Sequence, residues 1–383
     1  LTPIYKDDGF SDLPKIFQYN LIAPIAFKIG LTLYDILGSR EKNQKHINVD
    51  KSTTREMFPL LKQNKLKKSF IFQDAQTDDS KLVSTLLRNA VEVNNAIAIN
   101  YIEITDIKKT SSKYQITAHN KLNNKSYTFY AKNIIAATGV HNLPGEYKAK
   151  SSNIKFSGGA HLVLRGDPLK INGNGILLPK TEDNRIMFVL PWFGNTIVGT
   201  TDTETFSGTL DIPFANDVDK EYLKRHIKKY FRVDSVEYIS SWSGIRALID
   251  NNQTSTKNVS RGHFFNKVDE KFIQIAGGKL TGFRLIAKES LEILFNNKFE
   301  LEPLKFTKDI LELTNQFNES DLEKCFNHYC IAKPTDYMLR RTHISWFNEN
   351  GGKNEIKKIV TEFELTDAEN ETLEELKNEG LLG

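Results

Sequence analysis

The sequence predicts a protein of the mixed α/β (α+β) class, and three patterns support this prediction. Between residues 78 and 143, an amphipathic helix is followed by short runs rich in β-branched and aromatic residues. Residues 155–201 contain several such runs separated by turns with Gly and Pro, a pattern typical of an antiparallel sheet. Beyond about Leu301, the chain is strongly charged and has helical periodicity without a strand pattern.

The composition excludes several classes of protein. With 383 residues, of which 39% are hydrophobic and 26% charged, the chain resembles an ordinary globular protein of two or three domains. Its net charge is +4, and no basic stripe with interleaved aromatic residues is present, so we expect no nucleic-acid partner. The spacing of Cys325 and Cys330 fits neither a zinc pair nor a thioredoxin-like motif. We therefore expect inert thiols in a reducing compartment and no metal site.

The most apolar stretch of the sequence covers residues 21–37. It is interrupted by Pro24, Lys28, Gly30 and Asp35. A membrane-spanning helix needs about 20 predominantly apolar residues, so we do not expect one here. Packing in the core as a buried helical pair is the favoured interpretation, and an amphipathic segment on a membrane surface is the alternative. The chain opens on Leu1 rather than Met and has no secretory signal, as expected for a fragment.

The remaining elements are expected in the following order. Asp78 and Asp79 precede a helix whose apolar face carries Leu82, Val83, Leu86, Leu87, Ala90 and Val91. Strand-type runs cover residues 96–104, 114–118, 126–130 and 133–137, with a hairpin turn at residues 121–125. A helix is expected at residues 218–230, strands at 236–241, 263–265 and 272–276, and a helix at 281–295. We place a domain boundary near Glu302 and Pro303.

The strongest local motif is the sequence Gly277-Gly278-Lys279-Leu280-Thr281 between a strand and a helix. Two glycines allow a ligand to approach the backbone closely, and Thr281 is a candidate cap for the helix. The N–H groups at a helix N-terminus suit an anion or a developing negative charge. Taken alone, the motif is also consistent with a turn that only connects two elements.

Three further motifs combine small and polar residues. Thr138 and Gly139 end an apolar strand, where a cofactor can pass close to the backbone or where a buried strand simply stops. Arg246 follows Gly244 in an expected turn, and its guanidinium suits a phosphate, although a surface salt bridge explains it equally well. The polar cluster at residues 199–203 follows an apolar strand and is also consistent with a capped turn.

The order of these motifs resembles that of the FAD-dependent glycerol-3-phosphate dehydrogenases and the related α-glycerophosphate oxidases, which are DAO-type flavoproteins. The motifs that carry the resemblance are Ala137-Thr138-Gly139, Gly158-Gly159-Ala160-His161, Gly199-Thr200-Thr201-Asp202, Ser243-Gly244-Ile245-Arg246 and Gly277-Gly278-Lys279-Leu280-Thr281. Further matches are residues 31–38, Phe72-Gln73-Asp74, Asp78-Asp79, Pro191-Trp192, Pro334-Thr335-Asp336 and Arg340-Arg341-Thr342. The resemblance covers nearly the whole chain in the right order.

The resemblance implies a division of the chain into domains. It implies a substrate or cap region at residues 1–71 and an incomplete FAD-binding, Rossmann-like domain at residues 72–143 and 265–301. An antiparallel-sheet substrate domain would occupy residues 144–264, and a helical accessory domain residues 302–383.

The activity implied by the resemblance is oxidation of sn-glycerol 3-phosphate to dihydroxyacetone phosphate, with hydride transfer to FAD and electrons passed to quinone or oxygen. The protein would be cytoplasmic, and the resemblance is compatible with peripheral attachment to the inner face of the cell membrane and with a homodimer. His161 would be the general base, because an unperturbed imidazole titrates near neutral pH. Arg246 would bind the substrate phosphate or the oxygen being oxidised, and Lys279 would lie near substrate and flavin. The cofactor-binding residues would be Thr138, Gly139, Gly277, Gly278, Lys279, Leu280 and Thr281.

The sequence departs from the family pattern in several places. The glycine-rich turn that holds the FAD pyrophosphate in this family would lie before Leu1, so we expect the chain by itself to bind FAD weakly or not at all. Gly158, Ala247 and the pair Gly282-Phe283 replace the family's usual residues. Two alternatives stay open: another flavin oxidoreductase of the same fold acting on an amine or a hydroxy acid, and a non-catalytic remnant without FAD.

Overall fold

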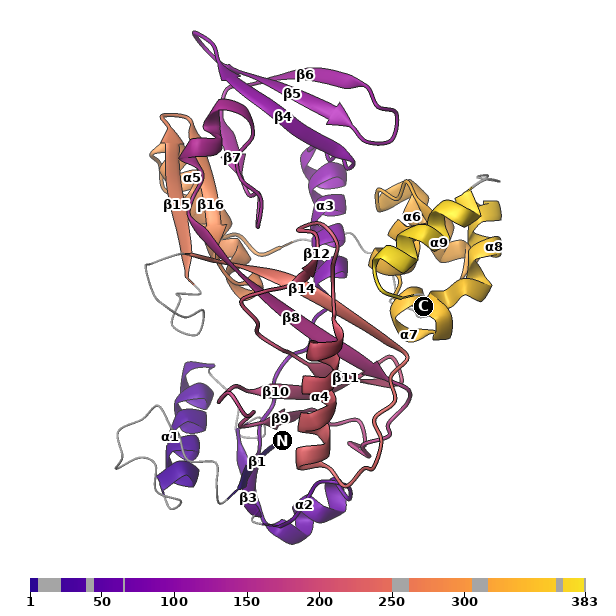
Figure 1. Cartoon of the computed structure of the whole chain (residues 1–383). Helices are drawn as coiled ribbons and strands as arrows, with labels where there is room; N and C mark the ends of the chain where they lie inside the picture. The colour runs from indigo at the N-terminus through magenta and orange to yellow at the C-terminus, as the bar shows by residue number, and fades with distance from the viewer. Residues whose placement is uncertain are drawn as a thin grey trace.

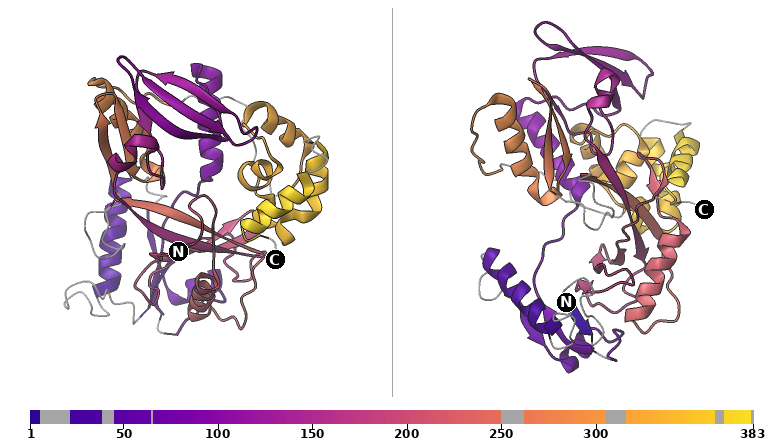
Figure 2. Two further views of the ribbon diagram at one scale, coloured as in Figure 1. Left: turned by 45° about the horizontal axis from the view of Figure 1, so that its top comes forward. Right: turned by 60° about the vertical axis from the view of Figure 1, so that its left-hand side comes forward.

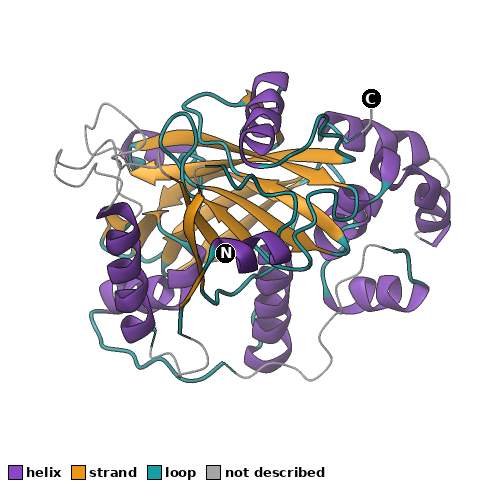
Figure 3. Ribbon diagram, turned by 90° about the horizontal axis from the view of Figure 1, so that it is seen from below, coloured by secondary structure: helices purple, strands orange, loops and turns teal. Residues whose placement is uncertain are grey.

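The computed structural model of the chain describes residues 1–5, 22–38, 45–64, 66–249, 262–304, 316–362 and 368–381. Helices and mostly antiparallel strands are both present, which confirms the predicted α/β (α+β) class. Seen from below, strands lie in the middle of the molecule and helices lie around them (Figure 3).

Two long strands form the backbone of the fold. β8 (Ile154–Leu164) and β14 (Ser240–Ile249) pair antiparallel over the whole length of β14, and this β8–β14 ladder crosses the middle of the molecule (Figure 1). β11 (Asn195–Gly199), β10 (Met187–Trp192) and β9 (Ile176–Leu178) extend the sheet in the order β14-β8-β11-β10-β9. A small hairpin, β12 (Ser207–Gly208) and β13 (Pro213–Phe214), lies beside it.

The N-terminal elements pack beneath the ladder. β1 (Thr2–Tyr5), β3 (Leu66–Ile71) and β2 (Ile47–Val49) form an antiparallel sheet in the order β1-β3-β2, accompanied by α1 (Ile22–Leu37) and α2 (Lys51–Met57). One hydrophobic core joins this region to the large sheet and to α4 (Asp217–Tyr230), and it includes Phe58, Leu162 and Leu223.

A second group of elements lies at the other end of the ladder. β7 (Ile134–Ala136) pairs parallel with β16 (Phe272–Gly277), which pairs antiparallel with β15 (His263–Asp269). A separate meander is formed by β4 (Ile102–Lys109), β5 (Tyr114–Asn120) and β6 (Ser126–Ala131). Two amphipathic helices complete the group, α3 (Asp79–Asn94) and α5 (Phe283–Phe295). Asp78 caps α3 by accepting a hydrogen bond from Lys81 N at 2.7 Å.

The described part of the C-terminal region is helical, as predicted. It contains α6 (Glu319–His328), a π-helical turn at Asp336–Arg341, α7 (Ile344–Phe347), α8 (Lys353–Glu362) and α9 (Ala368–Asn378). These helices share a core of their own, and they gather beside one end of the β8–β14 ladder (Figures 1 and 2). The Ser240 hydroxyl donates a hydrogen bond to the Trp346 carbonyl, which fixes this contact. Of the two cysteines, Cys325 is buried and Cys330 exposed, and both are free thiols.

Two predicted strands are placed wrongly. Residues 96–101 connect α3 to β4, because Asn95 ends α3 in the left-handed conformation and the strand begins only at Ile102. The strand expected at residues 236–241 is instead β14, which begins at Ser240 and runs to Ile249. Gly244 and Arg246 therefore lie inside a strand, opposite Gly159 and Ser157, and the turn expected before Arg246 is absent.

The favoured interpretation of the apolar stretch at residues 21–37 is also wrong. The stretch forms the single helix α1, and of the side chains described there Asp35 is buried while Ile25, Ile29, Leu33, Ile36 and Leu37 are each more than half exposed. Asp35 is held by the His46 ring, whose Nδ1 lies 2.6 Å from the carboxylate. Among the helices of the described residues, none is long and apolar enough to cross a membrane.

Candidate active site

One face of the β8–β14 ladder gathers three of the predicted site motifs. In the antiparallel register, His161 lies opposite Trp242, and Ser157 lies opposite Arg246. Side chains two residues apart on a strand point to the same face, so these four share one side of the sheet. Between them lies Gly159, where a Cβ would clash with the Arg246 guanidinium. The glycine thus makes room for the arginine.

His161 is the central titratable group of this face. Its ring stacks on Trp242 with centroids 5.1 Å apart and an interplanar angle of 16°, and a Cβ on Gly199 would clash with the ring. Its Nδ1 is buried without a hydrogen-bond partner among the described residues. Burial, and secondarily the charge of Arg246, lower the pKa of His161 from 6.5 to about 4. The imidazole is therefore neutral at pH 7.

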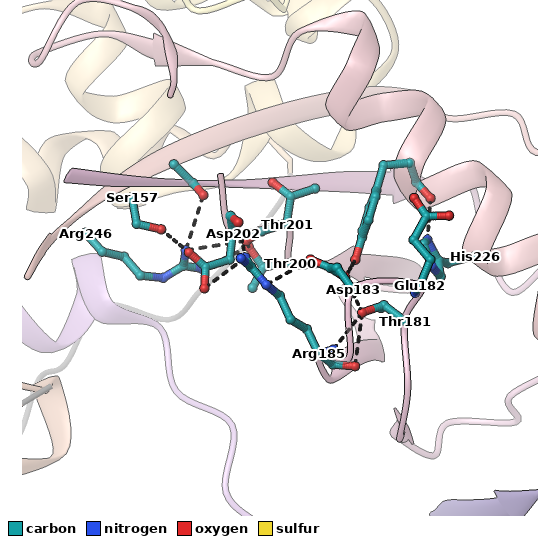
Figure 4. A network of polar contacts seen from close by, with 12 residues as sticks. Ser157, Thr181, Glu182, Asp183, Arg185, Thr200, Thr201, Asp202, His226 and Arg246 are labelled. Atoms are coloured by element: carbon teal, nitrogen blue, oxygen red, sulfur yellow. Dashed lines mark hydrogen bonds and ion pairs between the residues drawn. The ribbon is translucent and has the colours of Figure 1, made fainter. Parts of the chain in front are cut away.

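Arg246 is held by a polar network at the end of β11 (Figure 4). Its Nη2 donates to Thr200 Oγ1 at 3.0 Å, and its Nη1 lies 4.0 Å from Asp202 Oδ1. Asp202 also accepts a hydrogen bond from Ser157 and lies 2.9 Å from Arg185 Nη1 through its Oδ2. Asp202 thus pairs with Arg185 and also lies within ion-pair distance of Arg246.

The Gly277–Gly278 turn has a conformation that favours glycine. Its φ angles are +69° and +96°, and a Cβ on Gly278 would lie 2.8 Å from Ile286 Cδ1. The chain then makes a 3-10 turn at Leu280–Gly282 before α5 begins at Phe283. The prediction that Thr281 caps the helix is wrong, because neither this turn nor α5 has a side-chain cap. The first N–H groups of the helix are consequently left without a side-chain acceptor.

The parallel pairing of β7 and β16 brings two predicted cofactor motifs to one edge. Thr138 and Gly139 follow β7, and Gly277 ends β16, so both motifs lie at the carboxyl ends of neighbouring parallel strands. Gln274 Nε2 donates to Thr138 Oγ1 at 3.4 Å across this edge. Ligands of open α/β sheets bind at such an edge. Lys279 is exposed next to it.

A cavity of about 640 Å³ joins the ladder to this turn. Its wall includes His161, Thr200, Trp242 and Leu280. Thr200 connects it to Arg246, which is not itself part of the wall, and Ile249 at the end of β14 packs against Gly277. The structure thus brings His161, Arg246 and the Gly277–Thr281 motif close together, while Lys279 lies outside the wall.

Sequence reasoning did not identify two further walls of the cavity. One is the segment before and at the start of α3, residues 76–80, and the other belongs to the C-terminal helices, including Arg340 and His343. His343 Nε2 bonds to Asp78 and thereby joins the two walls. Burial alone would raise the pKa of Asp78, but the hydrogen bond and charge of His343 lower it below its ordinary value. Two sequence matches could have pointed to these walls, because both belong to the motifs that resemble one family. They are Asp78-Asp79 and Arg340-Arg341-Thr342.

The residues at the cavity fit a flavin better than a metal. Within the described ranges, His, Cys, Asp and Glu form no group that could hold a metal ion. The glycine turn and the uncapped N-terminus of α5 offer backbone N–H groups and the positive end of a helix dipole, which suit the electron-rich pyrimidine edge of a flavin.

Comparisons with known proteins agree with this geometry. The family model described as FAD dependent oxidoreductase matches residues 30–281. The chain is 30% identical over 314 residues to the mitochondrial glycerol-3-phosphate dehydrogenase of Schizosaccharomyces pombe, covering 74% of this chain and 48% of that protein. It is also 30% identical over 275 residues to the aerobic glycerol-3-phosphate dehydrogenase of Bacillus subtilis, covering 70% and 48%. The chain spans about half the length of these curated relatives.

Two solved structures share the fold. The glycerol-3-phosphate dehydrogenase of Bacillus halodurans, solved in complex with FAD, has a TM-score of 0.66 and 22% identity, with 87% of this chain and 78% of that chain covered. The L-proline dehydrogenase of P. horikoshii has a TM-score of 0.52 and 14% identity, with 78% and 72% covered. Because the family model matches well over half of the chain and the fold agrees, the chain belongs to the FAD dependent oxidoreductase family, as its motifs predicted.

Proposed function

We propose that the chain is part of an enzyme that oxidises sn-glycerol 3-phosphate to dihydroxyacetone phosphate with FAD as cofactor. The observation that carries the proposal is one cavity lined by the neutral imidazole of His161, by Thr200, which holds the Arg246 guanidinium, and by Leu280 of the glycine motif. The names of the relatives supply the substrate, and they favour this alcohol over other substrates of the fold.

The cofactor would be held by backbone groups. When bound, FAD supplies the acceptor for the hydride that leaves C2 of the substrate. The N–H groups after Gly278 would hold its pyrimidine edge, and Thr138 and Gly139 would approach it from β7. Lys279, exposed at the same turn, would add positive charge where negative charge develops.

His161 and Arg246 would act on the substrate. His161 is neutral at pH 7 and lines the cavity, so its imidazole would accept the C2 hydroxyl proton. Arg246 would bind the phosphate, because its planar guanidinium can donate two parallel hydrogen bonds. A carboxylate would suit Arg246 equally well, which keeps amine or hydroxy-acid substrates as the second candidate.

The test uses the full reading frame that contains this chain. We expect the purified protein to show a flavin absorbance spectrum that glycerol 3-phosphate bleaches anaerobically. Glycerol without the phosphate serves as the matched substrate, and we expect slower bleaching with it. Bleaching by an amino acid or a hydroxy acid but not by glycerol 3-phosphate would contradict this proposal and support an enzyme that acts on an amine or a hydroxy acid. A colourless protein would support a remnant without FAD.

We further propose a cytoplasmic protein that attaches peripherally to the inner face of the cell membrane through α1. The exposed residues Ile25, Ile29, Leu33 and Ile36 follow helical spacing and form an apolar stripe. Flotation with liposomes measures the attachment. Leu33→Asp should keep the protein out of the lipid fraction, whereas Val218→Asp, at an apolar residue on α4 that is even more exposed, should not. Equal flotation of both variants would argue against attachment through α1.

A further inference from the structure

A second cavity, of about 540 Å³, lies between α3 and the end of α6, and we call it the α3–α6 cavity. One wall is a single face of α3, where the lining residues follow helical spacing. They are Ser84, Leu87, Arg88, Val91 and Glu92. Residues 326–330 form the opposite wall, and Arg341 closes the cavity. Within the described part of the chain, no residue lines both this cavity and the active-site cavity, so the two are separate.

The walls of the α3–α6 cavity expose apolar side chains to it. Leu87 and Val91 on α3 are 45% and 39% exposed, and Phe326 on α6 is 42% exposed. Behind them, the buried ring of Tyr329 lies under the Arg88 guanidinium, whose central carbon is 5.3 Å from the ring centroid. Partly exposed apolar side chains in a concave site favour a ligand with an apolar body, because binding removes them from water.

The charges around the cavity favour a ligand with one negative charge. Among the residues that line it, Glu92 is the one carboxylate, and it already lies 2.8 Å from Arg88 Nε and 2.9 Å from His328 Nδ1. Arg341 is half-buried and donates its Nε to the Tyr329 carbonyl at 2.8 Å. Its guanidinium forms no ion pair with any of the described residues, and its two terminal nitrogens have no hydrogen-bond partner among them. One unbalanced guanidinium suits a carboxylate better than a doubly charged phosphate.

We propose that the α3–α6 cavity is a second ligand site, which binds a small carboxylate with an apolar body through the Arg341 guanidinium. The carboxylate accepts hydrogen bonds from the terminal nitrogens of Arg341, and the apolar body covers the exposed side chains of the two walls. Arg340, the preceding residue in the same π-helical turn, lines the active-site cavity instead. Two adjacent arginines thus serve different cavities, and the inference does not depend on the proposed function.

The thiol of Cys330 reports whether the cavity is occupied. Cys330 is exposed and lines the cavity, whereas Cys325, the other cysteine of the chain, is buried. The neutral disulfide dithiodipyridine exchanges with the Cys330 thiolate, which forms a mixed disulfide and releases thiopyridone, whose absorbance gives the rate. Cys330→Ser should abolish this release.

The probe is naphthoate, an aromatic carboxylate, and its matched control is naphthylmethanol, which has the same rings without the charge. We expect naphthoate to slow the modification of Cys330 saturably, and naphthylmethanol to need a roughly tenfold higher concentration for the same protection. Equal protection by the two compounds, or protection by neither, would overturn the proposal.

Variants of the two adjacent arginines identify the group that holds the carboxylate. Arg341→Gln should weaken the protection by naphthoate roughly tenfold, whereas Arg340→Gln should behave like the unaltered protein. Equal weakening in both variants would contradict the assignment to Arg341. Circular dichroism checks that each variant is folded. The comparison of naphthoate with naphthylmethanol needs no variant, so it decides even where Arg341→Gln unfolds because the Tyr329 carbonyl loses its donor.

Two outcomes distinguish this inference from the proposed function, because protection of Cys330 requires neither flavin nor turnover. Protection by naphthoate without bleaching of the flavin by glycerol 3-phosphate would support the second site and contradict the substrate. Bleaching by glycerol 3-phosphate without protection of Cys330 would support the substrate and contradict the second site.

Discussion

The buried imidazole of His161 should make the protein lose stability as the pH falls below 6.5. In the unfolded chain the imidazole binds a proton with a pKa of about 6.5. In the folded protein, burial and the charge of Arg246 lower that pKa to about 4. The unfolded state therefore binds the proton first, and protonation favours unfolding between these two values. At pH 7 and above, the imidazole is mostly neutral in both states and the effect is small.

The size of this loss of stability follows from the shift in the pKa of His161. A fall from 6.5 to about 4 spans about 2.5 units, each about 1.4 kcal/mol, so the complete loss is about 3 kcal/mol. At pH 4.5 most of it is present, about 2.5 kcal/mol. Other groups titrate over the same range, but they do so equally in a variant that lacks only this imidazole.

The free energy of unfolding can be measured by urea unfolding followed by tryptophan fluorescence. Trp242 stacks on His161, so this signal reports on the surroundings of the imidazole. The free energy of unfolding is compared at pH 7.0 and pH 4.5 for the unaltered protein, His161→Gln and His141→Gln. We expect the drop to be about 2.5 kcal/mol smaller in His161→Gln and unchanged in His141→Gln, whose ring is exposed. Equal drops in all three proteins would refute the reasoning.

Three further predictions concern the site and its walls. Arg246→Ala should lower kcat/KM for glycerol 3-phosphate by roughly thirty- to a thousandfold, and Arg246→Lys should not restore it. The loss of kcat/KM should be smaller for glycerol, which has no phosphate. Equal losses for both substrates would place the guanidinium at the reacting carbon. Gly278→Ala should lower thermal stability by about 1–3 kcal/mol because of its φ of +96° and the contact with Ile286, whereas Gly244→Ala, with open space at its Cβ, should cost much less. Asp78→Asn keeps the α3 cap but weakens the hydrogen bond to His343, so limited proteolysis should release the C-terminal helices faster. An unchanged cleavage rate would show that this hydrogen bond does not hold these helices in place.

Local patterns in the sequence were sufficient for the elements whose stability is local. The helix after Asp78 begins where the cap predicts, and the helix expected at 218–230 is α4, starting one residue earlier at Asp217. The hairpin turn at residues 121–125 connects β5 to β6, and the described part of the charged C-terminal region is helical. Side-chain periodicity and helix capping depend on residues that are close in sequence, so both can be recognised from the sequence alone. The order of the motifs along the chain was likewise sufficient for the family.

Only the tertiary structure decided which of these residues meet and which surfaces are exposed. β14 extends to Ile249 because β8 pairs with it throughout, a long-range contact that no local pattern at Gly244 or Arg246 reports. The apolar face of α1 stays exposed although its residues favour burial, because nothing in its own sequence indicates whether another element will cover it. Likewise, Trp192, Trp242 and Trp346 are far apart in sequence and become walls of one cavity only when the C-terminal helices pack against the β8–β14 ladder. Contacts between distant segments depend on the packing of the whole chain, and sequence spacing does not encode them directly.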